Sequence, residues 1–239
     1  MIIIPDVHGR TFWRKAVNEY IGKEPILFLG DYLDPYAYEG ITPSGAFQIF
    51  HEIIDLKKAN PQAITLLLGN HDLHYLNPAM EGGRLDYSRK RQIIEDVTEN
   101  AGLFRIAESA IIGDKKYLFT HAGVKSGWIQ KHKETLGNPE SEDIAGSLNS
   151  LWLDVDKRPM LLQILADVPF CRWGNSLYGS PIWNDVGDID DSLEETPGYI
   201  QVFGHTQLES EPVIGNHFMC LDVRCAFRLS DNVPIQALK

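Results

Sequence analysis

Short apolar runs alternate with amphipathic stretches along the first part of the chain. The runs Ile2–Ile4, Pro25–Leu29 and Ile64–Leu68 are bounded by Gly or Pro, which is typical of strands covered on both faces. Between them, residues 11–21 and 44–59 carry apolar side chains at helical spacing. This alternation of strand and helix predicts a mostly parallel sheet with helices on its faces.

The pattern continues more weakly beyond residue 88. The predicted elements are a helix over 88–100, strands over 103–112 and 116–121 around a Gly113-Asp114 turn, helical segments near 144–153 and 160–166, a strand over 199–203 and closing strands within 218–229. In the helix over 44–59, Ser44 is the expected N-cap. Because no flexible linker flanks residues 125–198, we interpret them as an inserted region that shapes substrate access within a single domain, 1–239.

Residues whose side chains can bind metal ions or transfer protons follow these apolar runs directly. They are Asp6 and His8, Asp31 and Asp34, Asn70 and His71, His121, and His205. Since ligands bind beyond the carboxyl ends of parallel strands, we expect these side chains at one edge of one sheet. Imidazole with carboxylate is the ligand set of a borderline divalent ion such as manganese, iron or zinc. The number of ligands predicts two such ions.

Composition narrows the possible partners. The formal charge of -11 argues against general binding to nucleic acid or to anionic membranes, but it is compatible with metal cations. The start Met1–Asp6 has no basic segment, and its apolar run is too short for a signal peptide or a membrane span. We therefore expect a cytoplasmic location and no membrane association.

Five sequence blocks together resemble the calcineurin-like metallophosphoesterases. The blocks are Asp6-x-His8-Gly9, Gly30-Asp31-x-x-Asp34, Gly69-Asn70-His71-Asp72, His121-Ala122-Gly123 and Gly204-His205-Thr206. They occur in the family's order, and each lies at the end of a predicted strand. The resemblance implies an α/β fold in which a two-sheet β-sandwich is flanked by helices. It also implies hydrolysis of phosphate esters by a metal-bound hydroxide.

The resemblance implies a role for each residue of these blocks. The expected metal ligands are Asp6 and His8 for the first ion, Asp31 for both ions, and Asn70, His121 and His205 for the second ion. His71 is expected to protonate the leaving oxygen as general acid. Asp34 is expected to hydrogen-bond to His71, because a nearby carboxylate orients an imidazole and favours its charged form.

Two details resemble the phosphoprotein phosphatase branch of this family, and one departs from it. The block Gly30-Asp31-Tyr32-Leu33-Asp34 and the segment 180–185 are similar to that branch, and Gln207 stands where many other members have a final histidine. However, Pro35-Tyr36 replaces the Arg-Gly that binds phosphate in that branch. The candidate replacements for that arginine are Arg10, Arg172 and Arg224.

The sequence therefore predicts a metal-dependent phosphomonoesterase acting on a phosphoprotein or a phosphorylated small molecule. The alternative within the enzyme class is a nucleotide or dinucleoside polyphosphate hydrolase, or a phosphodiesterase. A metal-free scaffold that binds a protein partner is the alternative from another class. The presence of all six expected ligands and of the Asp34 and His71 pair favours the enzyme.

Overall fold

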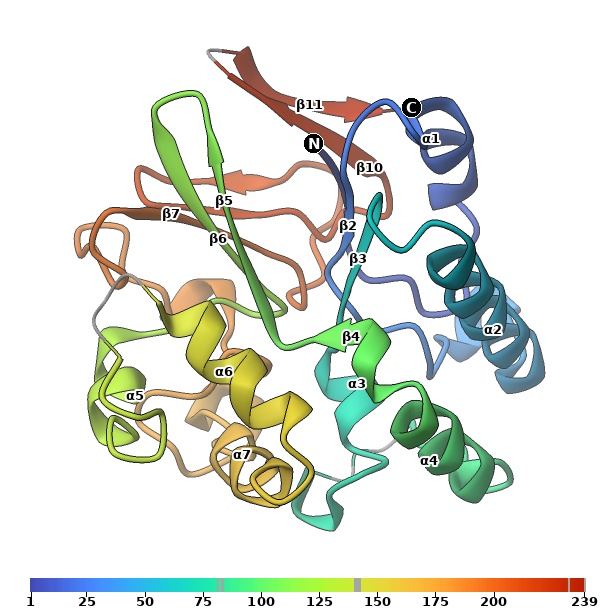
Figure 1. Cartoon of the computed structure of the whole chain (residues 1–239), viewed down its shortest axis with the longest axis horizontal. Coiled ribbons are helices and arrows are strands. Elements are labelled where there is room, and N and C mark those ends of the chain that lie inside the picture. Colours follow the sequence, from blue (N-terminus) through green and yellow to red (C-terminus); the bar gives the residue numbers. More distant parts are fainter. Residues whose placement is uncertain (81, 83, 140–142, 232, 239) are drawn as a thin grey trace. The chain divides into compact units, whose positions relative to one another are not determined.

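The computed structural model describes residues 1–80, 82, 84–139, 143–231 and 233–238 (Figure 1). The chain divides into two compact units. The first unit contains Met1–Arg105 and Arg224–Lys239, and the second contains Ile106–Val223. The last strands of the chain therefore complete the unit in which the chain begins.

The first unit contains a 6-stranded sheet in the order β11-β10-β1-β2-β3-β4. Its strands are β1 (Ile2–Ile4), β2 (Ile26–Phe28), β3 (Ile64–Leu67), β4 (Phe104–Arg105), β10 (Ala226–Ser230) and β11 (Val233–Leu238). Strands β1 to β4 are parallel, and β10 and β11 are antiparallel to their neighbours. The parallel arrangement predicted for the first apolar runs is confirmed. Every residue of β1 and β2 is buried, as expected of strands covered on both faces.

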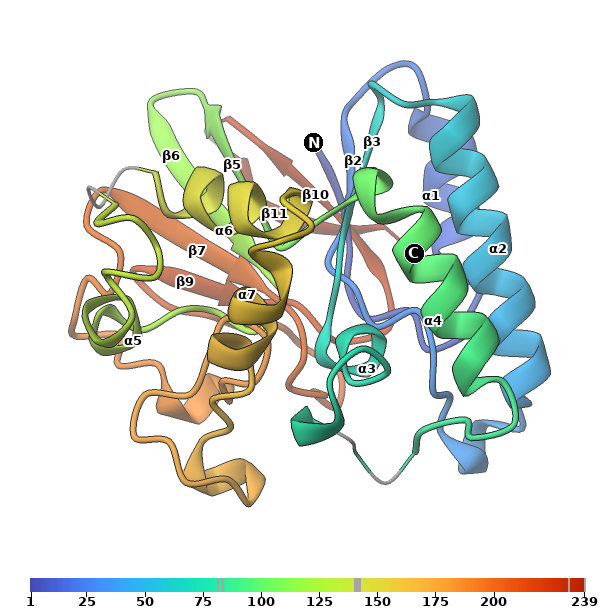
Figure 2. The same cartoon turned by 60° about the horizontal axis from the view of Figure 1, so that its bottom comes forward.

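Helices cover one face of this sheet. They are α1 (Trp13–Tyr20), α2 (Pro43–Ala59) and α4 (Lys90–Glu99), which Figure 2 shows on the same side of β2 and β3. The short helix α3 (Asn70–Leu73) follows β3, and single 3₁₀ turns occupy Ala37–Glu39, Pro78–Met80 and Ala101–Leu103. The predicted cap Ser44 is wrong. Thr42 caps α2 by accepting from Gly45 N at 3.0 Å, because Pro43 takes the first helical position.

The second unit contains a 5-stranded sheet in the order β5-β6-β7-β9-β8. Its strands are β5 (Ala107–Ile112), β6 (Lys115–Thr120), β7 (Tyr199–Phe203), β8 (Val213–Ile214) and β9 (Phe218–Cys220). Strands β6, β7 and β9 are parallel, whereas β5 and β8 pair antiparallel at the edges.

One predicted strand is split in two. The run 103–112 forms β4 in one sheet and β5 in the other, with a break at Ile106. At this break the Asn149 side chain accepts from Ile106 N at 2.9 Å and donates to Ala107 O at 2.8 Å. A side chain 43 residues away in sequence thus satisfies the backbone groups where the strand is interrupted.

The helices of the second unit are α5 (Ser126–Lys131), α6 (Ile144–Leu153) and α7 (Arg158–Leu165), with 3₁₀ turns at Phe170–Arg172 and Val186–Asp188. Helix α6 packs against β5 and α7. The predicted α/β fold with two sheets flanked by helices is confirmed. Among the helices that the structure describes, none has the length and apolar character needed to cross a bilayer.

Candidate metal centre

Backbone hydrogen bonds join the loops that follow β1 and β2. The amides of Val7 and His8 both donate to Asp31 O, at 3.1 and 2.7 Å. These bonds bring one ligand atom each from Asp6, His8 and Asp31 within 4.8 Å of one another, and all three residues are buried. The first unit by itself therefore contains a cluster of two carboxylates and one imidazole.

The backbone of this cluster lies in an uncommon conformation. His8, Asp31 and Asp34 have φ values of 45°, 52° and 55°, in the left-handed region that residues other than glycine rarely adopt. Such conformations cost of order 1 to 3 kcal/mol each and gather at functional sites. The free-energy cost of these conformations is consistent with loops whose sequence places the side chains of His8, Asp31 and Asp34 at a functional site.

The tautomer of His8 makes the cluster suitable for a cation. Its Nδ1 lies 2.7 Å from Leu33 O and must donate, because a carbonyl can only accept. Burial lowers the pKa of His8 from 6.5 to about 3, so the ring is neutral and its Nε2 carries a lone pair. That nitrogen lies 3.4 Å from Asp31 Oδ2. A neutral imidazole nitrogen and a carboxylate oxygen that face each other in a buried site are suited to binding a divalent ion between them.

Asp72 holds the loops after β2 and β3 together. Its carboxylate accepts from the amides of Asp31, Tyr32 and Gly69 at 2.8, 2.9 and 2.9 Å. A buried carboxylate with three amide donors is well satisfied and rigid. The sequence does not assign a role to Asp72, and the structure shows it positioning the backbone of the metal cluster.

His71 and Asp34 form the predicted pair. Nδ1 of His71 lies 2.8 Å from Asp34 Oδ2, and the His71 amide donates to Asp31 Oδ1 at 2.8 Å. Burial alone would raise the pKa of Asp34, but hydrogen bonds from His71 and His74 outweigh it and hold the pKa below its usual value. Asp34 is therefore a carboxylate and can orient the imidazole.

His74 and Tyr75 complete the surroundings of Asp34. His74 Nε2 lies 2.6 Å from Asp34 Oδ2, and the Tyr75 hydroxyl donates to Asp34 Oδ1. Burial, followed by the charge of Asp34, raises the pKa of Tyr75, so the hydroxyl stays protonated and donates. Tyr75 carries no signal in the sequence, because it resembles any core aromatic residue.

The second unit brings two other predicted ligands together. His121 follows β6, and His205 follows β7 with a φ of 65°. The nitrogens His121 Nε2 and His205 Nδ1 are 3.1 Å apart, and both residues are buried. Two imidazoles bound to one tetrahedral ion at about 2.1 Å place their nitrogens ~3.4 Å apart, which is close enough to the observed separation for binding to a common cation.

The predicted ligands do not lie at the edge of one sheet, and that expectation is wrong. Asp6, Asp31 and Asn70 follow β1, β2 and β3 of the first sheet, whereas His121 and His205 follow strands of the second. The reason is that apolar runs of both sheets end in the same way. Periodicity alone does not assign a strand to a sheet.

The candidate substrate arginines all contact carboxylates. Arg10 forms a bidentate pair with Glu39 at 2.8 and 3.0 Å, and Arg224 Nε lies 3.5 Å from the same side chain. In the second unit, Arg172 lies 2.6 Å from Asp185. Their role in binding phosphate stays a prediction.

Comparison with known proteins assigns the family. The model for calcineurin-like phosphoesterases matches residues 1–209. No curated protein sequence matches this chain. One similar solved structure is a cold-active protein-tyrosine phosphatase of a psychrophilic Shewanella species, with a TM-score of 0.56 at 15% identity over 100% of this chain and 80% of that one.

A second similar structure is a protein serine/threonine phosphatase from Saccharomyces cerevisiae, which has similarity to human phosphatase PP5. Its TM-score is 0.55 at 13% identity, over 92% of this chain and 65% of that one. At these identities the two structures support the fold, and the family model supports the chemistry. The protein therefore belongs to the calcineurin-like phosphoesterase family of metal-dependent hydrolases.

Proposed function

We propose that this protein hydrolyses phosphate monoesters, with phosphoproteins or phosphorylated small molecules as substrates. The observation that carries the proposal is the pair of His71 and Asp34 beside the cluster of Asp6, His8 and Asp31 within one unit. The rings of His8 and His71 are 5.2 Å apart. A proton donor thus lies next to a site suited to a cation.

Two divalent ions are part of the proposal, with manganese, iron or zinc preferred by the donor set. By the sequence resemblance, Asp6 and His8 would hold the first ion, Asp31 would serve both, and Asn70, His121 and His205 would hold the second. Bound there, such ions polarise a phosphoryl oxygen and lower the pKa of a water molecule. The facing nitrogens of His121 and His205 support the assignment of this pair to one ion.

His71 acts on the leaving group. With Nδ1 held by Asp34, its Nε2 is the ring nitrogen that faces away from the carboxylate. A proton on Nε2 passes to the leaving oxygen as the bond from that oxygen to phosphorus breaks. Asp34 stabilises the charged ring and keeps its orientation, and Asp34 is itself oriented by His74 and Tyr75.

The preference for monoesters is supported by the phosphatase activities named for both similar structures. A substrate panel tests it with the purified protein supplied with manganese, iron or zinc. The panel contains a phosphopeptide, p-nitrophenyl phosphate, a mononucleotide, a dinucleoside polyphosphate and bis-(p-nitrophenyl) phosphate. We expect activity on monoesters that requires metal and is abolished by EDTA.

Equal or greater activity on the dinucleoside polyphosphate or the bis-ester would replace the proposal with the polyphosphate hydrolase or phosphodiesterase. A metal-loaded protein inactive on the whole panel would favour the scaffold that binds a partner. A phosphopeptide preferred over p-nitrophenyl phosphate would identify the substrate as a phosphoprotein.

A further inference from the structure

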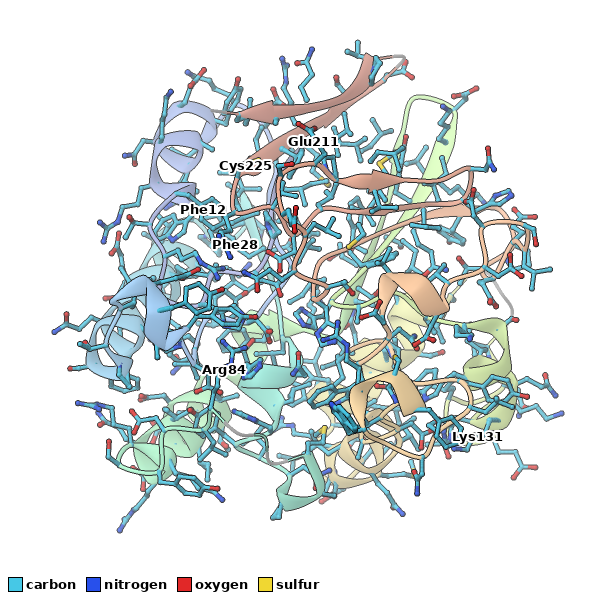
Figure 3. All side chains as sticks on the ribbon, turned by 180° about the vertical axis from the view of Figure 1, so that it is seen from behind. Phe12, Phe28, Arg84, Lys131, Glu211 and Cys225 are labelled. Carbon is cyan, nitrogen blue, oxygen red and sulfur yellow. The ribbon has the colours of Figure 1, made fainter. Side chains whose placement is uncertain are left out.

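Arg84 lies on the loop between α3 and α4, where Figure 3 labels it. Its Nη1 donates to Asp34 O at 2.9 Å, and its Nη2 donates to His71 Nε2 at 2.8 Å. Its guanidinium carbon lies 3.7 Å from the centre of the Tyr36 ring. These contacts hold the cation beside the proposed general acid, within the first unit.

Tyr36 belongs to the Pro35-Tyr36 pair that replaces the phosphate-binding Arg-Gly expected from the resemblance. In this chain that segment contains no arginine. It contains the Tyr36 ring instead, on which the Arg84 guanidinium packs. Stacking of a guanidinium on an aromatic face is favourable and restricts its orientation. The positive charge near the centre is thus supplied from another loop.

Arg84 differs from the arginines considered from sequence. Arg10 and Arg172 each contact a carboxylate at 3.0 Å or less. Among the residues that the structure describes, the partners of the Arg84 guanidinium are neutral: a carbonyl, an imidazole nitrogen and an aromatic ring. An anion can therefore engage this guanidinium without first displacing another anion.

We propose that Arg84 binds the phosphoryl group of the substrate, which rests on the hydrolase function proposed above. A leaving oxygen must come within hydrogen-bond distance of His71 Nε2 to receive its proton. In the structure, Arg84 Nη2 stands within hydrogen-bond distance of His71 Nε2, where the leaving oxygen has to lie. When substrate enters, a phosphate oxygen replaces His71 as the acceptor from Nη2. This exchange frees the lone pair of His71 Nε2. The ring then takes up a proton from water at Nε2 and, with Nδ1 held by Asp34, faces the leaving oxygen as its proton donor.

The chemistry of arginine suits this role. A guanidinium has five N–H donors in a planar fork that matches two oxygens of a phosphate. In the structure, Asp34 O accepts from Nη1 and His71 Nε2 accepts from Nη2. During the exchange the guanidinium stays in place, because it keeps its bond to Asp34 O and its contact with the Tyr36 ring. The side chain of His71 is 15% exposed, so this part of the centre is accessible to a ligand from solvent.

The test compares Arg84→Ala, Arg84→Lys and a matched control, Arg91→Ala. Arg91 is 92% exposed on α4 and pairs with Glu95, so the control removes the same charge away from the centre. The measurements are KM and kcat on p-nitrophenyl phosphate, the inhibition constant of inorganic phosphate, and the dissociation constant of inorganic phosphate by calorimetry on the metal-loaded protein. Metal content and the thermal unfolding midpoint check each variant.

We expect Arg84→Ala to raise KM, the inhibition constant and the dissociation constant of phosphate by about 10- to 100-fold, the loss expected for one charge-assisted hydrogen bond. Arg84→Lys, which keeps the charge but loses the fork and the stacking, should fall between Ala and the wild type. Arg91→Ala should match the wild type. Metal content should stay unchanged in all three variants.

Two outcomes would overturn the role of Arg84. One is unchanged phosphate affinity in Arg84→Ala. The other is a loss of kcat with unchanged phosphate affinity, which would identify Arg84 as a residue that only positions His71. If Arg84→Ala unfolds, Arg84→Lys with wild-type phosphate affinity overturns the proposal equally. A wild type that is inactive on phosphate esters overturns the hydrolase function itself. If the wild type is active and Arg84→Ala keeps its phosphate affinity, only the role of Arg84 is overturned.

Discussion

At the scale of single residues, His71 carries the most distinctive set of contacts. Its Nδ1 bonds to Asp34, its amide bonds to Asp31, and its Nε2 accepts from Arg84. His71, the proposed acid, is therefore linked through its backbone to Asp31, an expected metal ligand, and through its ring to the guanidinium of Arg84. Substitution of the ring should affect proton transfer while leaving the backbone bond to Asp31 intact.

We predict that His71→Asn lowers kcat on p-nitrophenyl phosphate by about two to four orders of magnitude, because the general acid is lost. Metal content should stay at the wild-type value, since the bond from the amide to Asp31 does not depend on the side chain. Steady-state kinetics and elemental analysis measure both quantities. Unchanged kcat would remove His71 from the mechanism.

Asp31→Asn is the matched comparison for His71→Asn. An amide replaces a carboxylate assigned to both ions, so elemental analysis should show reduced metal content together with lost activity. Full metal content in this variant would contradict the assignment of Asp31 as a shared ligand.

At the scale of elements, the centre of the first unit depends on the close approach of the loops after β2 and β3. Asp72 bonds to both loops, and Gly30 lies directly beneath the backbone of Gly69. A Cβ on Gly30 would lie 2.4 Å from Gly69 N, and Gly30 has a φ of +107°. Both the space and the conformation at this position require glycine.

We predict that Gly30→Ala destabilises the protein by about 2 to 5 kcal/mol, the sum of backbone strain and of the displaced Gly69 loop. Gly22→Ala is the matched control, because Gly22 has a φ of +76° but nothing within 4 Å of the added Cβ. That variant should lose only about 1 kcal/mol. Urea unfolding measures both, and equal losses would show that the contact with Gly69 contributes nothing.

At the scale of the whole molecule, buried titratable groups make the stability of the metal-free protein depend on pH. The pKa of His8 is lowered by burial from 6.5 to about 3, so between these values the unfolded chain binds a proton that the folded chain does not. Stability therefore decreases as the pH falls below 6.5. Asp34, whose pKa is lowered, adds to the loss below its ordinary pKa of 3.8.

We predict that the urea midpoint of the EDTA-treated protein falls steadily as the pH decreases from about 7 to about 4. His8→Gln cannot take up this proton, so its midpoint should change less over the same range. Equal slopes for both proteins would show that another group causes the effect. Added manganese or zinc should raise the wild-type midpoint, because an ion that binds only the folded state stabilises it.

Local pattern alone predicted many of the elements and most of the candidate site. Strands such as β1 and β7, and the loops with Asp6, Asp31 and Asn70, follow from short apolar runs that end in Gly or Pro. Helices such as α6 follow from apolar residues at helical spacing. These features are encoded by neighbouring residues, because strand and helix periods are local properties. The assignment to a metal-dependent hydrolase family followed from the order of these blocks.

The division of the strands between two sheets, the break at Ile106 and the role of Asp72 required the tertiary structure. So did Arg84, which lies 13 residues beyond His71 in a loop without a recognisable pattern. Each of these depends on contacts between residues far apart in sequence, such as Asn149 with Ala107 or Asp72 with Tyr32. The sequence by itself determined which residues end the strands, whereas only folding decided which side chains meet there, because such contacts have no local period to reveal them.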